Sequence, residues 1–167
     1  MLMKDLVEIN KETSRLLWKM PNFTSGSIPL TFSRLIFPTL CNGAIIKNFS
    51  ADTFVCSTNA LTESGELYNI DGNGSRVAPM LYGPKQVILV AGINKIVRDI
   101  EEAEKRVRQY AAPIDAKRLG KDTPCTTLGY CIDCKSPNRI CNDFVVIKGQ
   151  FVKGRIKVII VRKQLGY

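Results

Sequence analysis

The sequence predicts an α/β protein whose mainly parallel sheet is covered on both faces by helices. Short apolar runs typical of buried strands alternate with segments of helical periodicity along the chain. Strands and helices that alternate in this way are joined by crossover connections, which make neighbouring strands parallel. The 167 residues, 45% of them hydrophobic, are long enough for one domain with its own core.

The first 50 residues divide into a predicted helix and an irregular segment. Residues 4–18 place apolar side chains at helical spacing, and Pro21 ends the pattern. Glycines and prolines interrupt residues 22–50, where neither a helix period nor a strand period persists. We therefore expect the core domain to comprise residues 51–167.

Order returns after residue 51. Residues 53–57 and 66–70 read as strands joined by a polar turn, which predicts a hairpin, and residues 76–81 predict a short helix. Residues 86–91 form the clearest strand, since Val87 to Val90 are all apolar, as in a central strand buried on both faces.

A capped helix is predicted to follow. Asp99 is its expected N-cap, with Glu102 completing a capping box, and Pro113 begins a second short helix. Three i,i+4 charge pairs predict a solvated outer face that supports the helix: Glu101–Lys105, Glu102–Arg106 and Glu104–Arg108. Strands at 144–148 and 157–161 complete the fold.

Charge and composition exclude several classes of function. The net charge is +9 and there is no histidine, so acid–base chemistry must use carboxylates, lysine, tyrosine or cysteine. The basic residues are dispersed without a run or a stacking-aromatic pattern, which favours a small anionic ligand over a nucleic acid. Neither a membrane span nor a signal peptide is recognisable, so we expect a cytoplasmic protein.

Four of the six cysteines lie close together in the sequence. Cys125, Cys131, Cys134 and Cys141 have the spacing C-x5-C-x2-C-x6-C, which satisfies the ligand count of an iron–sulfur cluster or of a tetrahedral zinc ion. The spacing departs from the familiar motifs of either, so a redox-active disulfide or reduced cysteines that merely pack remain alternatives. Cys41 and Cys56 have apolar neighbours and are expected in the core.

A glycine-rich polar loop follows the second strand. Asp71, Gly72, Asn73 and Gly74 precede a predicted helix, and Arg76 adds a cation, so an anion could bind there. A simple turn capped by Asp71 explains the same residues equally well.

A second candidate surface lies where strands end. Asn94 and Lys95 follow the central strand and Asn59 follows an earlier one. Ligands of open α/β sheets bind at the carboxyl ends of strands, so these side chains could meet the Asp71 loop in one pocket.

Several of these segments together resemble the lactate-utilisation (LUD) domain family. The resemblance covers residues 51–167 and is carried by STNALTESGEL at 57–67, NIDGNG at 69–74, GINKIV at 92–97, AP at 112–113, and TPC with CIDCKSPNRIC between 123 and 141. It implies a Rossmann-like three-layer sandwich, similar to the NagB/RpiA/CoA-transferase-like superfamily. Carried over by position, the family's recurring loop residues are Asn59, Glu63, Asn69, Asp71, Gly72, Asn73, Gly74, Arg76, Asn94 and Lys95. Residues 1–50 depart from the family pattern and look shortened.

The resemblance implies a link to the oxidation of lactate or another hydroxy acid, with electron transfer. Lys95 and Arg76 would neutralise a small anionic metabolite, and Glu63, Asp71 and Lys95 are the candidate catalytic groups. An iron–sulfur protein is an expected partner, and a homo-oligomer is compatible with this reading. The alternatives are a non-catalytic partner subunit with structural zinc, or a CoA-transferase-like or isomerase-like enzyme acting through Glu63 or Glu66.

Overall fold

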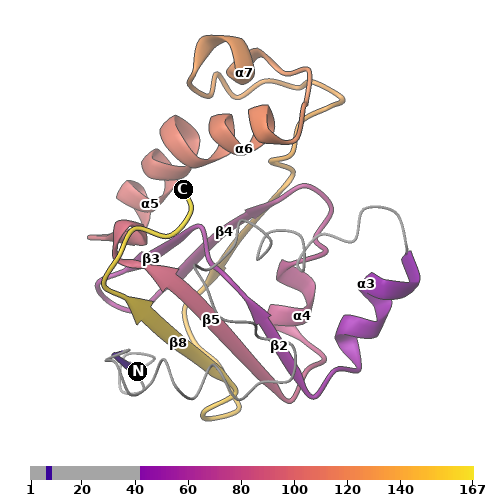
Figure 1. The fold of residues 1–167 in the computed structure, drawn as a ribbon, viewed down its shortest axis with the longest axis vertical. Helices are drawn as coiled ribbons and strands as arrows, with labels where there is room; N and C mark the ends of the chain where they lie inside the picture. The colour runs from indigo at the N-terminus through magenta and orange to yellow at the C-terminus, as the bar shows by residue number, and fades with distance from the viewer. Residues whose placement is uncertain (1–6, 9–41) are drawn as a thin grey trace.

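The structure is a computed structural model, and it describes residues 7–8 and 42–167 (Figure 1). Its first sheet, sheet A, is parallel throughout and has the strand order β1-β8-β5-β2. The strands are β1 (Val7–Glu8), β8 (Ile156–Val161), β5 (Gln86–Gly92) and β2 (Thr53–Cys56). The apolar run at β5 occupies an interior position, between β2 and β8, as its sequence predicts.

A second sheet, sheet B, is mixed and has the order β6-β3-β4-β7. Its strands are β6 (Ile96–Val97), β3 (Ala60–Thr62), β4 (Leu67–Asp71) and β7 (Asp143–Ile147). The predicted hairpin of 53–57 with 66–70 is wrong, because β2 pairs with β5 in sheet A while the short strand β3 pairs with β4. Three residues are too few to show a strand period, which is why the sequence concealed β3.

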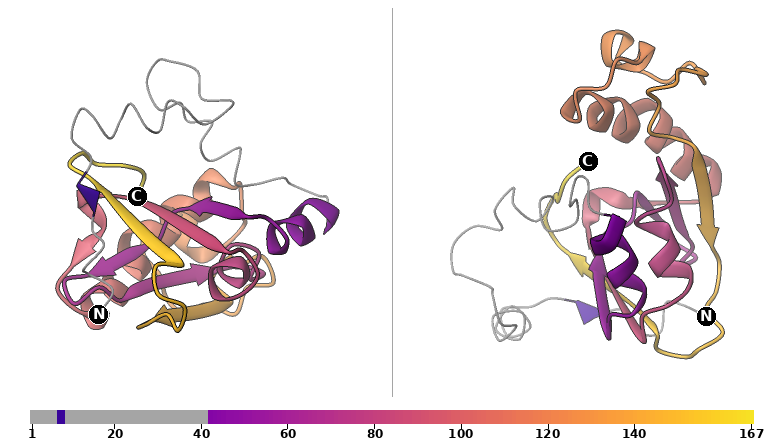
Figure 2. Two further views of the ribbon diagram at one scale, coloured as in Figure 1. Left: turned by 90° about the horizontal axis from the view of Figure 1, so that it is seen from below. Right: turned by 90° about the vertical axis from the view of Figure 1, so that its right-hand side faces the viewer.

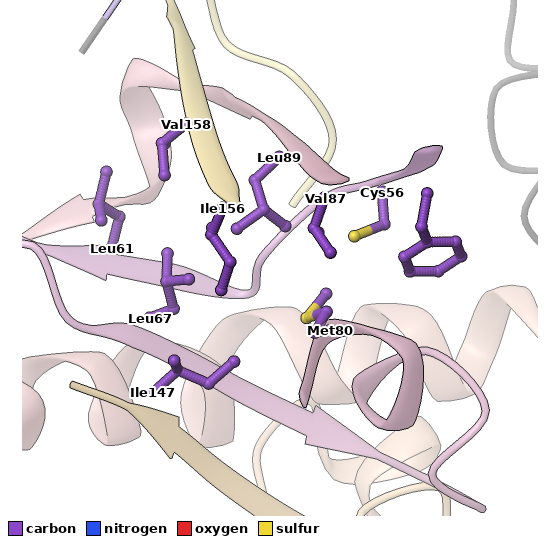
Figure 3. Close-up of a cluster of buried hydrophobic side chains, with 10 residues drawn as sticks. Cys56, Leu61, Leu67, Met80, Val87, Leu89, Ile147, Ile156 and Val158 are labelled. Atoms are coloured by element: carbon purple, nitrogen blue, oxygen red, sulfur yellow. The ribbon is translucent and has the colours of Figure 1, made fainter. Parts of the chain in front are cut away.

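The main core lies between the two sheets (Figure 3). Val87 and Leu89 of β5 and Val158 of β8 face Leu67 of β4, and Met80 closes one side of this cluster. Apolar burial of this kind contributes about 25 cal/mol per Å². The layer opposite sheet A is thus a second sheet, where helices had been expected on both faces.

Helices form the third layer, on the far face of sheet B (Figure 2). They are α5 (Ile100–Arg106), the π-helical turn η3 (Val107–Ala111) and α6 (Ala112–Arg118), which run on without a break where two separate helices were predicted. Asp99 caps α5 by accepting a hydrogen bond from the backbone N–H of Glu102, as predicted. The Glu102 carboxylate, however, accepts from the N–H of Arg98. The α/β class and the Rossmann-like three-layer arrangement with a mainly parallel sheet A are confirmed.

Shorter helices complete the fold: α3 (Asn42–Phe49), α4 (Val77–Leu81), the 3-10 turn η2 (Ile93–Lys95) and α7 (Pro124–Leu128). The end of α4 is fixed by the buried Arg155, whose guanidinium donates to the carbonyls of Pro79, Met80 and Pro84. The carbonyls of Pro79 and Met80 are acceptors that the end of a helix leaves unpaired, and a cation is favourable beside them.

Three further predictions concern the N-terminal helix, the two cysteines outside the cluster, and membrane spans. The helix predicted at 4–18 is wrong at Val7–Glu8, which is strand β1, and its other residues lie outside the described part of the chain. Cys56 is completely buried in the core, as predicted, and burial raises the pKa of its thiol to about 12, whereas Cys41 lies outside the described residues. Within the described residues, no helix has the length and apolar character needed to span a bilayer.

Candidate functional site

The candidate site lies at the carboxyl ends of two neighbouring strands of sheet A. Strands β2 and β5 run parallel, and both end on the side of the molecule where α5 and the C-terminus lie (Figure 1). Ser57, Thr58 and Asn59 follow β2, while Asn94 and Lys95 follow β5. Because parallel strands end at one edge, these polar residues come together, as the sequence predicts.

Arg76 is the centre of a hydrogen-bond network at this edge. Its Nη1 donates to the Ser57 carbonyl at 2.8 Å and to Asn69 Oδ1 at 2.6 Å. Its Nη2 donates to Asn59 Oδ1 at 2.7 Å and to the Ile70 carbonyl at 3.0 Å, and Nε lies 3.3 Å from Asp71 Oδ1. All five guanidinium donors are therefore used within the protein. Arg76 joins β2, β4 and α4 and has no donor left for a ligand.

Asp71 ends β4, and its side chain lies at the start of α4. Its Oδ2 accepts from the N–H groups of Arg76 at 2.9 Å and of Val77 at 3.2 Å. Asn73 Oδ1 accepts from the Ser75 N–H. Three of the N–H groups that could form an anion nest in the glycine-rich loop are thus paired internally, which agrees with the alternative in which Asp71 caps a turn.

Lys95 is a buried amine at the same edge, with only 8% of its surface exposed. Its Nζ donates to Ser57 Oγ and to the Thr58 carbonyl, both at 3.1 Å. Burial lowers the pKa of Lys95 to about 8, and the nearby cations Arg106 and Arg76 act in the same direction. Lys95 therefore holds its proton far less tightly than an ordinary lysine.

Arg106 belongs to this site although its sequence context hid it. The i,i+4 spacing predicted a surface pair with Glu102, but Arg106 Nε donates to the Asn94 carbonyl at 3.1 Å and Nη1 to the Asn59 carbonyl at 2.8 Å. Both hydrogen bonds join α5 to the strand ends. Of the three predicted helix pairs, only Glu104–Arg108 forms a salt bridge within the described residues.

The C-terminal residues fold across this edge. Asn94 Oδ1 accepts from the Leu165 N–H at 3.0 Å, and Asn94 Nδ2 donates to the Gly166 carbonyl at 3.1 Å. The Tyr167 hydroxyl donates to Asp115 Oδ1 on α6. A Cβ at Gly166 would lie 3.8 Å from Lys95 Nζ, so the backbone of this segment passes directly over the lysine.

Asn69 has one buried group without a partner. Its Oδ1 accepts from Arg76 Nη1 and from the Asn59 N–H, which fixes the orientation of the amide because both partners are donors. The Nδ2 group is fully buried and has no hydrogen-bond acceptor among the described residues. A buried donor of this kind costs roughly 1–3 kcal/mol unless a water or another acceptor reaches it.

Glu63 and Glu66 lie apart from the cationic edge. They occupy the turn between β3 and β4, whereas Asn59 and Asp71 lie at the opposite end of that hairpin. Glu66 forms an ion pair with Lys148 and accepts from Thr62 and Ser64. The structure therefore brings together Asn59, Asn69, Asp71, Arg76, Asn94 and Lys95, but not Glu63.

The four clustered cysteines border one recess. Its lining includes all four side chains, with Ala112 and Ala116 of α6 behind them and Arg139 beside them. Burial raises the pKa of the Cys141 thiol, while Arg139 lowers it and Cys131 and Cys134 raise it further, which shows that these sulfurs interact. All four cysteines thus line one recess, and their role as ligands of a metal or cluster stays a prediction.

Hydrogen-bond donors surround several of these sulfurs. The Asp133 N–H donates to Cys131 Sγ at 3.3 Å from a residue with φ of 54°, and Arg108 Nη1 lies 3.9 Å from the same sulfur. Thr123 Oγ1 lies 3.2 Å from Cys125 Sγ. Donors at sulfur stabilise the thiolate form, which is the form that binds metals.

The described cysteines do not form a preformed site for a single metal ion. Each sulfur around zinc lies about 2.3 Å from the metal, so the four must nearly touch. Within the described residues, no group of three or more cysteine, aspartate or glutamate side chains is spaced to hold one metal ion. The four cysteines line one recess, but this recess is not a preformed mononuclear site.

The cysteine segment adjoins the Asp71 loop. The Asn142 N–H donates to the Asp71 carbonyl at 2.9 Å, and Asn142 Nδ2 donates to the Gly72 carbonyl at 2.8 Å. A Cβ at Gly72 would lie 3.5 Å from the backbone of Ile140. The recess and the sheet edge are therefore connected by direct backbone contacts.

Comparison with known proteins places the chain in a family. The sequence model of the LUD domain matches residues 34–161, which is more than half of the chain. The chain belongs to the LUD domain family. This LUD domain protein is similar to a crystal structure of a DUF162 family protein from Deinococcus radiodurans, with 18% identity and a TM-score of 0.40 over 74% of this chain. The match spans 60% of that protein's length. No curated protein matches the sequence.

Proposed function

We propose that this LUD domain protein holds an iron–sulfur cluster on Cys125, Cys131, Cys134 and Cys141 and binds a small anionic metabolite beside Lys95. Membership of the family supports a role related to lactate utilisation. The observation that carries the proposal is that four cysteines from different turns of the chain line one recess. Such a protein would serve in the oxidation of lactate or a related hydroxy acid.

The lack of a local core supports a metal-linked segment. None of residues 124–142 is buried, so apolar packing contributes little to holding this stretch in place. Small segments of this kind commonly owe their order to disulfides or metals.

Basic side chains lie beside the proposed ligands. Arg139 donates to the carbonyls of Cys134 and Cys141, and Arg108 lies beside Cys131. Hydrogen bonds and positive charge near sulfur also set the reduction potential of a cluster. When bound, the cluster would supply one-electron transfer; these arginines would hold its ligands and balance their charge.

The electrostatics of the sheet edge support an anionic ligand. Arg76, Lys95 and Arg106 converge there, and Asp71 is the carboxylate that pairs with Arg76. Arg106 uses Nε and Nη1 in its hydrogen bonds to the strand ends, and Nη2 has no hydrogen bond within the described part of the chain, so Nη2 could bind a carboxylate or phosphate. An anion bound beside Lys95 and Arg106 would relieve the repulsion between these two cations.

Anaerobic purification tests the cluster. We expect brown protein with iron and sulfide and with visible absorption that is lost in Cys134→Ser, while Cys56→Ser, which changes a core thiol, keeps its colour. Zinc alone would overturn the cluster and favour a structural metal in a non-catalytic partner subunit. Metal-free protein in which all thiols react would overturn both.

A thermal-shift series tests the anion site. Lactate, sugar phosphates and CoA esters are compared with chloride at equal ionic strength, and stabilisation by at least one of them is expected. The shift should disappear in Arg106→Met and persist in Lys85→Met, which removes an exposed cation. An absence of stabilisation by every anion would overturn the site.

A further inference from the structure

Ser57 and Lys95 form a close pair of a hydroxyl and an amine at the carboxyl ends of β2 and β5. The Oγ and Nζ atoms are 3.1 Å apart. A second hydrogen bond, from Nζ to the Thr58 carbonyl, fixes the direction of the amine. Ser57 is partly exposed whereas Lys95 is buried behind it, so the hydroxyl is the more accessible member.

This arrangement has the parts of an activated nucleophile. Such sites place a hydroxyl within hydrogen-bond reach of a base, and a third group orients the base. Serine–lysine pairs with these roles occur on unrelated folds. Here both partners of Lys95 are uncharged oxygens, so its proton is not held by a carboxylate.

We propose that Ser57 and Lys95 are a nucleophile and base that transfer the acyl group of an activated carboxylic ester or thioester. That the natural substrate also carries an acidic group rests on the proposed anion site; the acyl chemistry itself stands on the geometry of the dyad. Neither residue lies in the cysteine segment, and the proposed steps use only Ser57, Lys95 and water.

The steps conserve atoms and protons. Neutral Lys95 accepts the hydroxyl proton as Ser57 Oγ bonds to the acyl carbon, and the bond from that carbon to the alcohol or thiol breaks. The leaving group takes the proton from the Lys95 ammonium and departs. Water then attacks the acyl-serine and passes a proton to Lys95, and the carboxylic acid leaves as the Ser57 hydroxyl is restored.

The surroundings of Lys95 keep much of the amine neutral near pH 8. Burial has the largest effect on its pKa, Arg106 from α5 and Arg76 from the start of α4 lower it further, and Asp115 on α6 acts weakly in the opposite direction. The rate of acylation should therefore rise with pH and level off above about pH 8.

A contact that merely satisfies a buried lysine would look the same in the structure, and reactivity separates the two roles. The full-length protein is treated with p-nitrophenyl acetate and with a fluorophosphonate, and the modified peptide is located by mass spectrometry. We expect an adduct on Ser57 that is absent from Ser57→Ala. Lys95→Met should slow the labelling by about 10²–10⁴-fold. Ser50→Ala and Lys85→Met, both at exposed sites, should react like the wild type.

The dyad would be overturned if no adduct formed on Ser57 or if Lys95→Met labelled Ser57 at an unchanged rate. It would also be overturned if the labelling rate had the same pH profile in the wild type and in Lys95→Met. Thermal unfolding of each variant shows whether it is folded. If Lys95→Met does not fold, Ser57→Ala still tests the dyad, because this variant retains the buried lysine. The two probes carry no negative charge and need no metal. A negative result with them therefore does not affect the thermal-shift test of the anion site or the spectroscopic test of the cluster.

Discussion

The sheet edge and the cysteine segment are both built from polar loops, yet they are held in place in different ways. At the sheet edge, Arg76 and Lys95 direct their donors to oxygens of the same protein, so the geometry is complete before any ligand arrives. In the cysteine segment, no side chain from 124 to 142 is buried and the thiols face a shared recess. The first region is preorganised by its own hydrogen bonds, whereas the second has no buried side chain of its own to fix it.

Removing Arg76 is the strongest test of preorganisation. Arg76→Ala removes the cation beside the Asp71 carboxylate and takes one donor from each of the Asn59 and Asn69 oxygens, and breaking a buried ion pair costs about 3–5 kcal/mol. Urea unfolding should show this loss. Arg98→Ala, which removes an exposed pair with Asp99, should change stability by less than about 1 kcal/mol. Equal effects would mean that the network is not structural.

The pH dependence of stability sharpens the account of Lys95. Its pKa is about 8 in the folded protein and near 10.5 when exposed, so the unfolded chain binds more protons between these values. The free energy of unfolding should therefore rise from pH 8 to pH 10.5, by on the order of 3 kcal/mol relative to Lys95→Met. Lys85→Met serves as the matched control. Parallel curves for wild type and Lys95→Met would show that the amine titrates normally.

Limited proteolysis asks whether the cysteine segment depends on a bound group. Trypsin should cut after Lys135 and Arg139 at least about tenfold faster once the cluster is removed anaerobically, which corresponds to about 1.4 kcal/mol of local stabilisation. Cleavage after Lys148 and Lys153, on the exposed loop between β7 and β8, is the internal control. Equal rates at all four positions would remove the distinction between the two regions.

The smallest effect is expected at Asn94. Asn94→Ala removes two hydrogen bonds to the backbone of the C-terminal segment near the surface, so it should cost about 1 kcal/mol and accelerate amide exchange at Leu165. Exchange in β5 should stay slow. A large drop in global stability would instead make the C-terminal segment part of the core.

Local patterns were a good guide where one segment carries its own signal. The apolar run of β5 and the Asp99 cap each predicted what the structure contains. Strand β3 failed because three residues have no readable period, and the second sheet could not be foreseen without it.

Arg106 shows why part of the site stayed hidden. Its spacing from Glu102 is that of a surface ion pair, and the contact that it makes instead involves carbonyls 12 and 47 residues away. Backbone carbonyls occur at every residue and leave no trace in the sequence, so only the tertiary fold selects them.

The π-helical turn gives the helix layer a further property. Arg106 reaches the sheet edge and Arg108 reaches Cys131 and Asp133, so two residues of one helix hold the two regions. Successive α-helical residues differ by about 100° in direction, which turns these side chains to nearly opposite sides. The π-helical turn at Val107–Ala111 holds one residue more than an α-helical turn of nearly the same rotation. Deleting one residue there would let the turn close with α-helical hydrogen bonds and keep α6 facing the recess, whereas a deletion between Ala112 and Ala116 would rotate the rest of α6 by about 100° and turn part of the recess wall away from the sulfurs.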